Sequence, residues 1–230
     1  MNTKTQLLFI LCLWFSFSIT TSAQSSYQVG ILPSINLNYK LKKDWSLNFK
    51  IESRQLLERG TFDGDIDKGY EYVLTDYSLI AAKKVGLNSR ISGGYLFRFR
   101  EGKATHRFIQ QYTTTQKLSR LRLAHRVVTD QTFSPAESTE YRLRYRLVVE
   151  IPLNGQSADP KEFYLKIGNE YLNSIQATAY DLEMRLVPLL GYALGENHKI
   201  EGGLDYRVNQ FLNQSARHSF WLSLNWFIDL

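Results

Sequence analysis

The chain has 230 residues, a formal net charge of +6 and a hydrophobic share of 43%, which is enough apolar material for a folded domain and excludes a disordered chain. Beyond residue 20, no apolar run approaches the ~20 residues that a membrane-spanning helix needs, so a helical membrane protein is excluded as well. The single cysteine, Cys12, lies in the N-terminal apolar stretch. Disulfide scaffolds and thiolate metal sites are therefore excluded from the rest of the chain.

The N-terminus has the features of an export signal. Lys4 supplies a positive charge, residues 7–19 form a short apolar segment, and residues 21–23 (Thr-Ser-Ala) are small, as a signal peptidase requires. We therefore expect a signal peptide over residues 1–23 and a single mature domain over residues 24–230. The alternative is a retained N-terminal membrane anchor, which the short apolar run disfavours.

The mature part alternates between apolar and polar residues with period two, which predicts β-strands with two different faces. The first two runs, 29–41 and 45–54, flank a short turn and predict a hairpin. Nine further runs follow, at 70–82, 87–100, 106–117, 121–133, 139–153, 163–173, 179–194, 199–211 and 218–230. Most of the runs have 11 to 14 residues. Strands of soluble proteins average ~5–6 residues, whereas membrane-barrel strands need ~9–11, so the lengths favour a membrane barrel.

The run over residues 140–151 shows the two faces most clearly. On one face lie Tyr141, Leu143, Tyr145, Leu147, Val149 and Ile151, and on the other Glu140, Arg142, Arg144, Arg146 and Glu150. The first face suits lipid and the second is ionic, so the fold class is predicted as all-β, an antiparallel up-and-down transmembrane β-barrel of 10–12 strands. Single-chain bacterial barrels have even strand numbers, which indicates that one of the eleven runs is misassigned. A secreted soluble β-sandwich or barrel that acts as a binding module is an alternative.

The connections and aromatic residues indicate an orientation in the membrane. Segments 42–44, 83–86, 119–120 and 195–198 are short, whereas 57–69 and 209–217 are longer and polar, as expected of periplasmic turns and outside loops respectively. Six residues are predicted as membrane-interface aromatics: Tyr39, Trp45, Tyr192 and Trp226 near short turns or the C-terminus, and Tyr95 and Phe97 nearer the long loops. The final strand alternates to Leu230 and resembles the terminal strands by which outer-membrane proteins are recognised for insertion.

A family resemblance is carried by four blocks: HRFIQQYTTTQKLSRLRLAHRVVTDQTF (106–133), EYRLRYRLVVEIPL (140–153), EFYLKIGNEYLN (162–173) and YDLEMRLVPLLGYALG (180–195). They resemble the arginine-rich strands of an uncharacterised outer-membrane β-barrel family, domain of unknown function 2490, found mainly in Bacteroidetes. The resemblance extends from WSLNFKIESR (45–54) to the last strand. It implies a barrel in the outer membrane of a Gram-negative bacterium, and it implies no particular activity.

The inward-facing charges predict what fills the barrel. The predicted lumen network consists of Arg54, Arg90, Arg98, Arg122, Arg126, Arg142, Arg144, Arg146, Arg185, Arg207, Glu52, Asp130, Glu150, Glu170, Glu183 and Asp205. Five further charged residues are also predicted to face inward: Arg100, Arg107, Glu140, Asp181 and Glu201. Guanidinium–carboxylate pairs are suited to bracing opposite walls of a small barrel. They predict an ion-paired plug in a structural or adaptor protein, or a narrow, porin-like, anion-preferring channel that uses the surplus positive charge. The expected partners are outer-membrane lipid, the barrel-assembly machinery during insertion, and a small anion or an unidentified protein.

Catalytic and metal sites have little support in the sequence. An outer-membrane lipid-modifying enzyme of lipase or deacylase type, the main alternative function, needs a serine and a histidine on one face, but the adjacent His218 and Ser219 point to opposite faces. The histidines and carboxylates lack metal-ligand spacing, and the glycines lack a phosphate-binding context. The arginines alternate inward instead of forming an exposed stripe for nucleic acid. We therefore expect no enzyme, no cofactor, no metal and no nucleic-acid partner.

Overall fold

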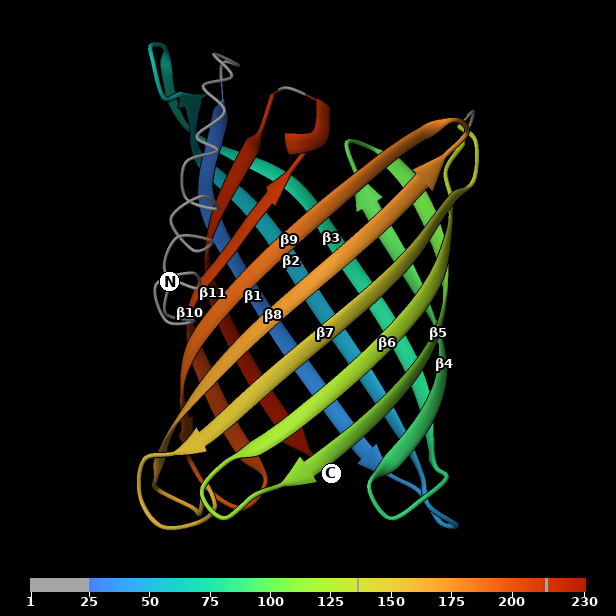
Figure 1. The fold of residues 1–230 in the computed structure, drawn as a ribbon, viewed down its shortest axis with the longest axis vertical. Coiled ribbons are helices and arrows are strands. Elements are labelled where there is room, and N and C mark those ends of the chain that lie inside the picture. Colours follow the sequence, from blue (N-terminus) through green and yellow to red (C-terminus); the bar gives the residue numbers. More distant parts are fainter. Residues whose placement is uncertain (1–24, 136, 214) are drawn as a thin grey trace, which may run out of the picture.

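The computed structural model describes residues 25–135, 137–213 and 215–230, and these residues form a closed barrel of eleven strands (Figure 1). The strands are β1 (Ser26–Lys40), β2 (Trp45–Thr61), β3 (Ile66–Lys84), β4 (Ser89–Arg100), β5 (Lys103–Lys117), β6 (Arg122–Phe133), β7 (Glu140–Pro152), β8 (Phe163–Gln176), β9 (Ala179–Ala193), β10 (His198–Asn209) and β11 (Arg217–Asp229), with a short 3₁₀ turn, η1 (Phe211–Asn213), before β11. All eleven alternating runs are strands, so the predicted all-β barrel is confirmed. The predicted signal peptide, residues 1–23, lies outside the described residues.

No helix within the described part of the chain is long and apolar enough to cross a membrane.

The barrel closes through a parallel pair of strands. All other neighbours are antiparallel, but β1 pairs with β11 in parallel, with Ser26 opposite Arg217 and Asn38 opposite Asp229. Strands that alternate in direction run the same way at the first and the eleventh position, so an odd number requires a parallel closure. The expectation of an even strand number, with one misassigned run, is therefore wrong. β1 continues through Pro33, which pairs with Leu224 of β11.

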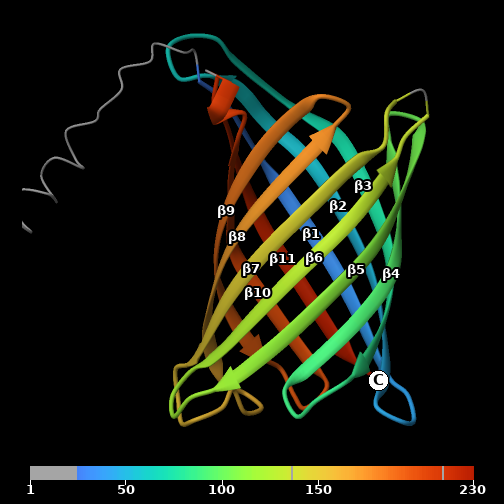
Figure 2. The same ribbon diagram turned by 45° about the vertical axis from the view of Figure 1, so that its right-hand side comes forward.

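The odd number also places the start of β1 and the end of β11 at opposite ends of the barrel (Figures 1 and 2). We call the end at which β1 begins the N-terminal end, and the end at which β11 finishes the C-terminal end. Both ribbons show the strands strongly tilted against the barrel axis, as closure of a sheet requires.

Connection lengths do not divide between the two ends as the sequence predicts. The C-terminal end has connections 41–44, 85–88, 118–121, 153–162 and 194–197, and the N-terminal end has 62–65, 101–102, 134–139, 177–178 and 210–216. The longest of them, 153–162, thus lies at the end predicted to have only short turns, so that prediction is wrong. Segment 57–69, predicted as a long loop, is mostly strand because β2 and β3 pair as far as Gly60 and Ile66.

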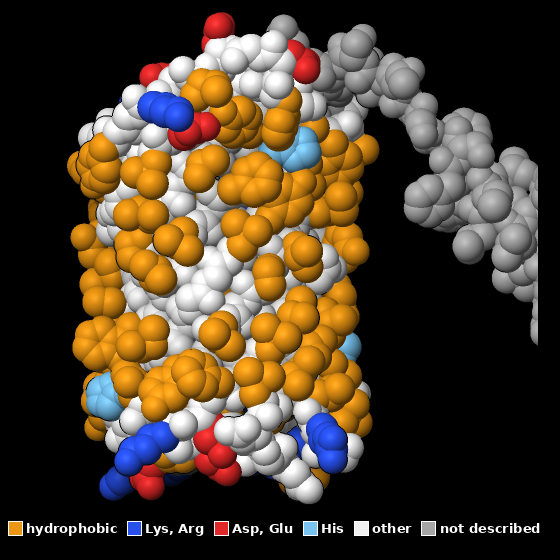
Figure 3. Space-filling view, turned by 90° about the vertical axis from the view of Figure 1, so that its left-hand side faces the viewer, with side chains coloured by type: hydrophobic (Ala, Val, Ile, Leu, Met, Phe, Trp, Pro, Cys, Tyr) orange, Lys and Arg blue, Asp and Glu red, His pale blue; other side chains and the backbone are white. Residues whose placement is uncertain are grey.

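The two faces of the wall differ as the alternation predicts. On the face shown in Figure 3, apolar side chains are spread over the middle of the barrel, and charged side chains lie at the two ends. On β7, Tyr141, Leu143 and Tyr145 are exposed on this outer face, whereas Arg142 and Arg144 face a cavity inside the barrel. The interior of this barrel is therefore polar, and the apolar surface points outward.

One inward patch is apolar and fills one side of the lumen. Leu32, Leu56 and Trp221 pack together on β1, β2 and β11 and are almost completely buried. The Trp221 ring lies directly over Gly30, where a Cβ atom would be only 2.6 Å from the indole. Glycine at this position therefore allows the largest inward side chain to lie flat against the wall.

Candidate functional site: the charged lumen

The barrel encloses a cavity of about 900 Å³ that is lined by residues of all eleven strands. Its lining includes Lys84 and Leu87 at the C-terminal end and Asp181 and Asn209 at the N-terminal end, so the cavity extends along the barrel. Eleven arginines, three lysines and eight carboxylates belong to the lining. Positive groups therefore outnumber negative ones along its length.

The structure places the sixteen residues of the predicted lumen network inside the barrel wall. Fourteen line the cavity, namely all ten of the arginines together with Glu52, Glu170, Glu183 and Asp205. Asp130 lies behind the lining with 0% exposure, and Glu150 lies opposite Arg122 in the register of β6 and β7. Asp76, Lys50 and Lys166 also line the cavity and were not predicted, although the same alternation with apolar neighbours indicates that each of them faces inward.

Asp130 is the centre of the densest group of ion pairs. Its carboxylate lies 2.6 Å from Nε of Arg142, 2.9 Å from Nη2 of Arg144 and 3.5 Å from Nε of Arg107. The Nε–H of Arg107 is also donated to Thr132, at 2.8 Å. One fully buried carboxylate thus holds three arginines from the two strands that flank β6, which links β5, β6 and β7 across the lumen wall.

Further pairs continue this arrangement around the barrel. Arg98 and Asp76 form a bidentate pair with two distances of 2.7 Å, and Arg207 and Asp205 form another with distances of 2.8 and 2.9 Å. Arg185 contacts both Glu170, at 3.1 Å, and Glu183. Glu52 lies 2.5 Å from Lys50 and 3.2 Å from Arg54. We call these residues and the Asp130 group the ionic network. It spans β2 to β10, and the apolar patch of β1, β2 and β11 completes the circle. Bidentate pairs of this kind are strong and geometrically specific, so the network braces and narrows the lumen.

A separate group lies near the C-terminal end. Glu201 is 3% exposed and accepts hydrogen bonds from the Tyr164 hydroxyl at 2.9 Å and from Lys166 at 2.7 and 2.9 Å. All polar atoms that this group brings together are thus mutually satisfied, which is the condition for burying a carboxylate at low cost.

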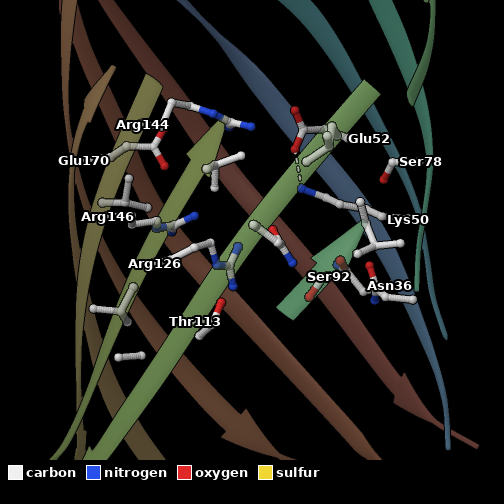
Figure 4. A pocket seen from close by; sticks show the side chains of 18 of the residues that line it. Asn36, Lys50, Glu52, Ser78, Ser92, Thr113, Arg126, Arg144, Arg146 and Glu170 are labelled. Carbon is white, nitrogen blue, oxygen red and sulfur yellow. Dashed lines mark hydrogen bonds and ion pairs between the residues drawn. The ribbon is translucent and has the colours of Figure 1, made fainter. Parts of the chain in front are cut away.

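Four cavity-lining arginines form no ion pair among the described residues, namely Arg90, Arg122, Arg126 and Arg146. Two of the four, Arg126 and Arg146, are direct neighbours. They lie directly opposite each other in the register of β6 and β7. Among the residues that the structure describes, neither has a carboxylate oxygen within 4.0 Å. Figure 4 shows both side chains extending into the cavity, with Thr113 beside Arg126 and with Ser92 and Asn36 on the facing wall.

The predicted interface aromatics lie on the outer face. Tyr39, Trp45 and Trp226 are exposed near the C-terminal end, and Tyr192 packs there against Phe163 with the two rings tilted by 45°. Tyr95 lies near the middle of β4 and Phe97 closer to the N-terminal end, where it contacts Tyr77 and His106. Aromatic side chains are therefore present toward both ends of the apolar outer surface.

Three of the four described histidines pair with tyrosines on the outer face, and the fourth, His198, lies against Trp226. Nδ1 of His125 lies 2.8 Å from the Tyr145 hydroxyl, and Nδ1 of His218 lies 2.8 Å from that of Tyr206. His106 is hydrogen-bonded to Tyr95 in the same way. In the part of the chain that is described, no group of three or more His, Cys, Asp or Glu side chains is arranged to hold a metal ion.

A family model described as "Protein of unknown function (DUF2490)" matches residues 14–220. The match includes β1 to β10, the first residues of β11 and each of the four arginine-rich blocks. No curated protein and no solved structure matches the chain.

Proposed function

We propose that this chain, which belongs to the DUF2490 family, is an outer-membrane β-barrel protein whose lumen is a narrow, anion-preferring passage. The observation that carries the proposal is the cavity, which extends along the barrel and has fourteen cationic but only eight anionic side chains in its lining. A lumen lined with an excess of one charge attracts ions of the opposite sign.

Three features support a position in the outer membrane of a Gram-negative bacterium. The strands have 12 to 19 residues, more than the ~9–11 that a tilted membrane-spanning strand needs. The face shown in Figure 3 has apolar side chains over its middle and charged side chains at its ends. The sequence begins with a predicted export signal. Outer-membrane lipid and the assembly machinery that inserts barrels are the partners that follow from this location.

The ionic network accounts for the narrowness of the passage. Its carboxylates are held by arginines from the same or neighbouring strands, so each pair keeps its side chains in the lumen. Breaking a buried pair by removing one partner is costly, which keeps the wall from opening. A structural or adaptor protein with a closed, ion-paired plug is the competing interpretation.

We propose a non-enzymatic role for the chain. A lipase or deacylase would need an imidazole beside a serine hydroxyl. His106, His125 and His218 instead use Nδ1 to contact tyrosine hydroxyls on the outer face. Ser219, next to His218 in the chain, points inward and accepts a hydrogen bond from Gln28.

Fractionation tests the location. The protein is expected to be cleaved after Ala23 and recovered with outer membranes as a band whose electrophoretic mobility changes on heating. Recovery as a soluble periplasmic protein would contradict the proposal and favour the secreted binding module.

Planar-bilayer recordings test the passage. The wild type should carry a small current that prefers anions, and the preference should fall as salt screens the lumen. Arg90 lines the cavity near the C-terminal end, so Arg90→Glu should weaken the preference. Lys83 on the neighbouring strand faces outward, with its ammonium 5.5 Å from the Trp45 ring centre, so Lys83→Glu is the matched control. Absence of conductance in the wild type would reject the passage and would favour the competing interpretation of a closed, ion-paired plug.

A further inference from the structure

Arg126 and Arg146 place two like charges side by side, and although Glu170 of β8 lies opposite Arg146 in register, neither arginine forms an ion pair among the described residues. In-register residues on one face of an antiparallel pair have Cβ atoms about 4.5–5.5 Å apart, and like charges in this position are destabilising. Elsewhere in the lumen, the nearest comparable arginines share the Asp130 carboxylate. A pair of guanidinium groups that lacks such a carboxylate is an arrangement suited to binding an anion from solution.

The wall behind Arg146 is shaped to receive its guanidinium. Gly168 of β8 lies beneath it, and a Cβ atom at Gly168 would be 3.2 Å from Nη2 and 3.5 Å from Nε of Arg146. The Nε atom is buried and has no hydrogen-bond partner. A buried N–H without an acceptor is costly, and an oxyanion at this position would supply the acceptor.

The neighbouring carboxylates are already engaged. Glu170, which lies opposite Arg146 in the register of β7 and β8, is 3.1 Å from Arg185. Glu52, on the facing wall, contacts Lys50 at 2.5 Å and Arg54 at 3.2 Å. The positive charge of Arg126 and Arg146 is therefore available to a ligand.

The rest of this part of the cavity is neutral and rich in hydrogen-bonding groups. Thr113 is in register with Arg126 on β5, and Asn36, Ser78 and Ser92 lie across the cavity (Figure 4). Hydroxyl and amide groups can both donate and accept hydrogen bonds. Such a wall suits a hydroxylated molecule better than an apolar one.

We propose that Arg126 and Arg146 bind the phosphate group of a small hydroxylated phosphomonoester that enters the lumen. Two planar guanidinium forks match the charge and the oxygen geometry of a phosphate dianion. The hydroxylated part of the ligand then contacts the neutral wall of Thr113, Ser92 and Asn36. This proposal deepens the proposed function by assigning a solute class to the same lumen, but binding itself requires only that solutes reach the cavity.

Calorimetric titration of the folded, detergent-purified protein tests the site, with glucose 6-phosphate and inorganic phosphate as probes and sodium chloride at equal ionic strength as the blank. Arg126→Gln and Arg146→Gln should each weaken binding of glucose 6-phosphate by roughly ten- to hundredfold, since each removes charged hydrogen bonds. Arg90→Gln removes a cavity-lining arginine of another wall and is the matched control. Equal loss in all three variants, or no binding to a correctly folded wild type, would overturn the site.

Gly168→Ala tests the site without altering any charge. The added methyl group should displace the Arg146 guanidinium and weaken binding, whereas Gly93→Ala, where the nearest atom to a new Cβ is 4.0 Å away, should leave binding unchanged. Unchanged binding in Gly168→Ala would show that general attraction to a positive lumen is sufficient, and would overturn the built site.

The two probes separate the two sources of phosphate. Tighter binding of glucose 6-phosphate than of inorganic phosphate supports the phosphomonoester, whereas equal affinity overturns it in favour of free phosphate. Because titration needs no bilayer, binding without conductance would reject the passage and retain the site. Conductance without binding would reject the phosphate site and retain the passage.

Discussion

Two pairs of arginines on the same stretch of wall have different surroundings. Arg142 and Arg144 of β7 lie within 3 Å of the buried Asp130, whereas Arg146, on the same face of the same strand, lies opposite Arg126. The side chains are chemically identical, so the neighbouring strand decides their role. In one place β6 contributes a carboxylate and the arginines brace the barrel. In the other it contributes a second arginine, and the two are available to a ligand.

The largest effect is expected at Asp130. Asp130→Asn keeps the size of the side chain but leaves Arg107, Arg142 and Arg144 without their shared negative charge. Removing one partner of a buried ionic group costs about 3–5 kcal/mol, so the free energy of unfolding should fall by this amount. Urea unfolding in detergent, followed by tryptophan fluorescence, measures it. A loss below about 1 kcal/mol would show that the ionic network does not brace the wall.

The second largest effect is expected when an arginine is introduced on the outer face of β7, and it tests which residues of this strand face outward and which face the lumen. Leu147 faces outward and Val148 lines the cavity. If the outer face contacts lipid, Leu147→Arg should cost about 2–4 kcal/mol of stability near the middle of the membrane, and Val148→Arg should cost less because its side chain meets a polar lumen. Unfolding in lipid vesicles compares the two variants. Equal tolerance at both positions would contradict the assigned faces.

A smaller effect of opposite sign is expected at the like-charged pair. Arg146→Gln relieves repulsion with Arg126 and removes no ion pair seen among the described residues, so stability should stay constant or rise by about 0.2–1 kcal/mol. The same urea titration used for Asp130→Asn measures it. A decrease comparable to that of Asp130→Asn would mean that Arg146 is a bracing residue after all.

The smallest perturbation tests the two ends of the barrel. A protease-cleavable tag before Ser26 and one after Leu230 should lie on opposite sides of the membrane, because the parallel β1–β11 pair puts these positions at opposite ends. Protease added to intact cells should remove only one of the two tags. Removal or protection of both together would contradict the parallel closure.

Much of the barrel follows from period-two alternation alone. In a strand, successive side chains point to opposite faces whatever the strand pairs with, so Arg142, Arg144 and Arg146 can be assigned to one face without a structure. Asp76 and Lys166 follow from the same rule, although the predicted network does not include them.

Contacts between strands could not be predicted in this way. Alternation assigns a residue to a face, but the register decides what lies opposite it, and a shift of two residues would preserve every face while exchanging every partner. The register places Asp130 opposite Arg142 and Arg126 opposite Arg146. The extension of β2 and β3 to Gly60 and Ile66 likewise depends on their pairing, since that stretch is polar and reads as a loop.

Alternation along single strands is enough to predict the positions of the strands, the inward face of the lumen charges and the apolar outer surface, but the expected even strand number was wrong because it does not follow from any single strand. The parallel closure of the barrel, the three arginines around one carboxylate and the space that Gly168 leaves for Arg146 appear only once the strands are assembled. The physical reason is that these contacts join residues far apart in the chain, and closure of the barrel sets the alignment of all its strands at once.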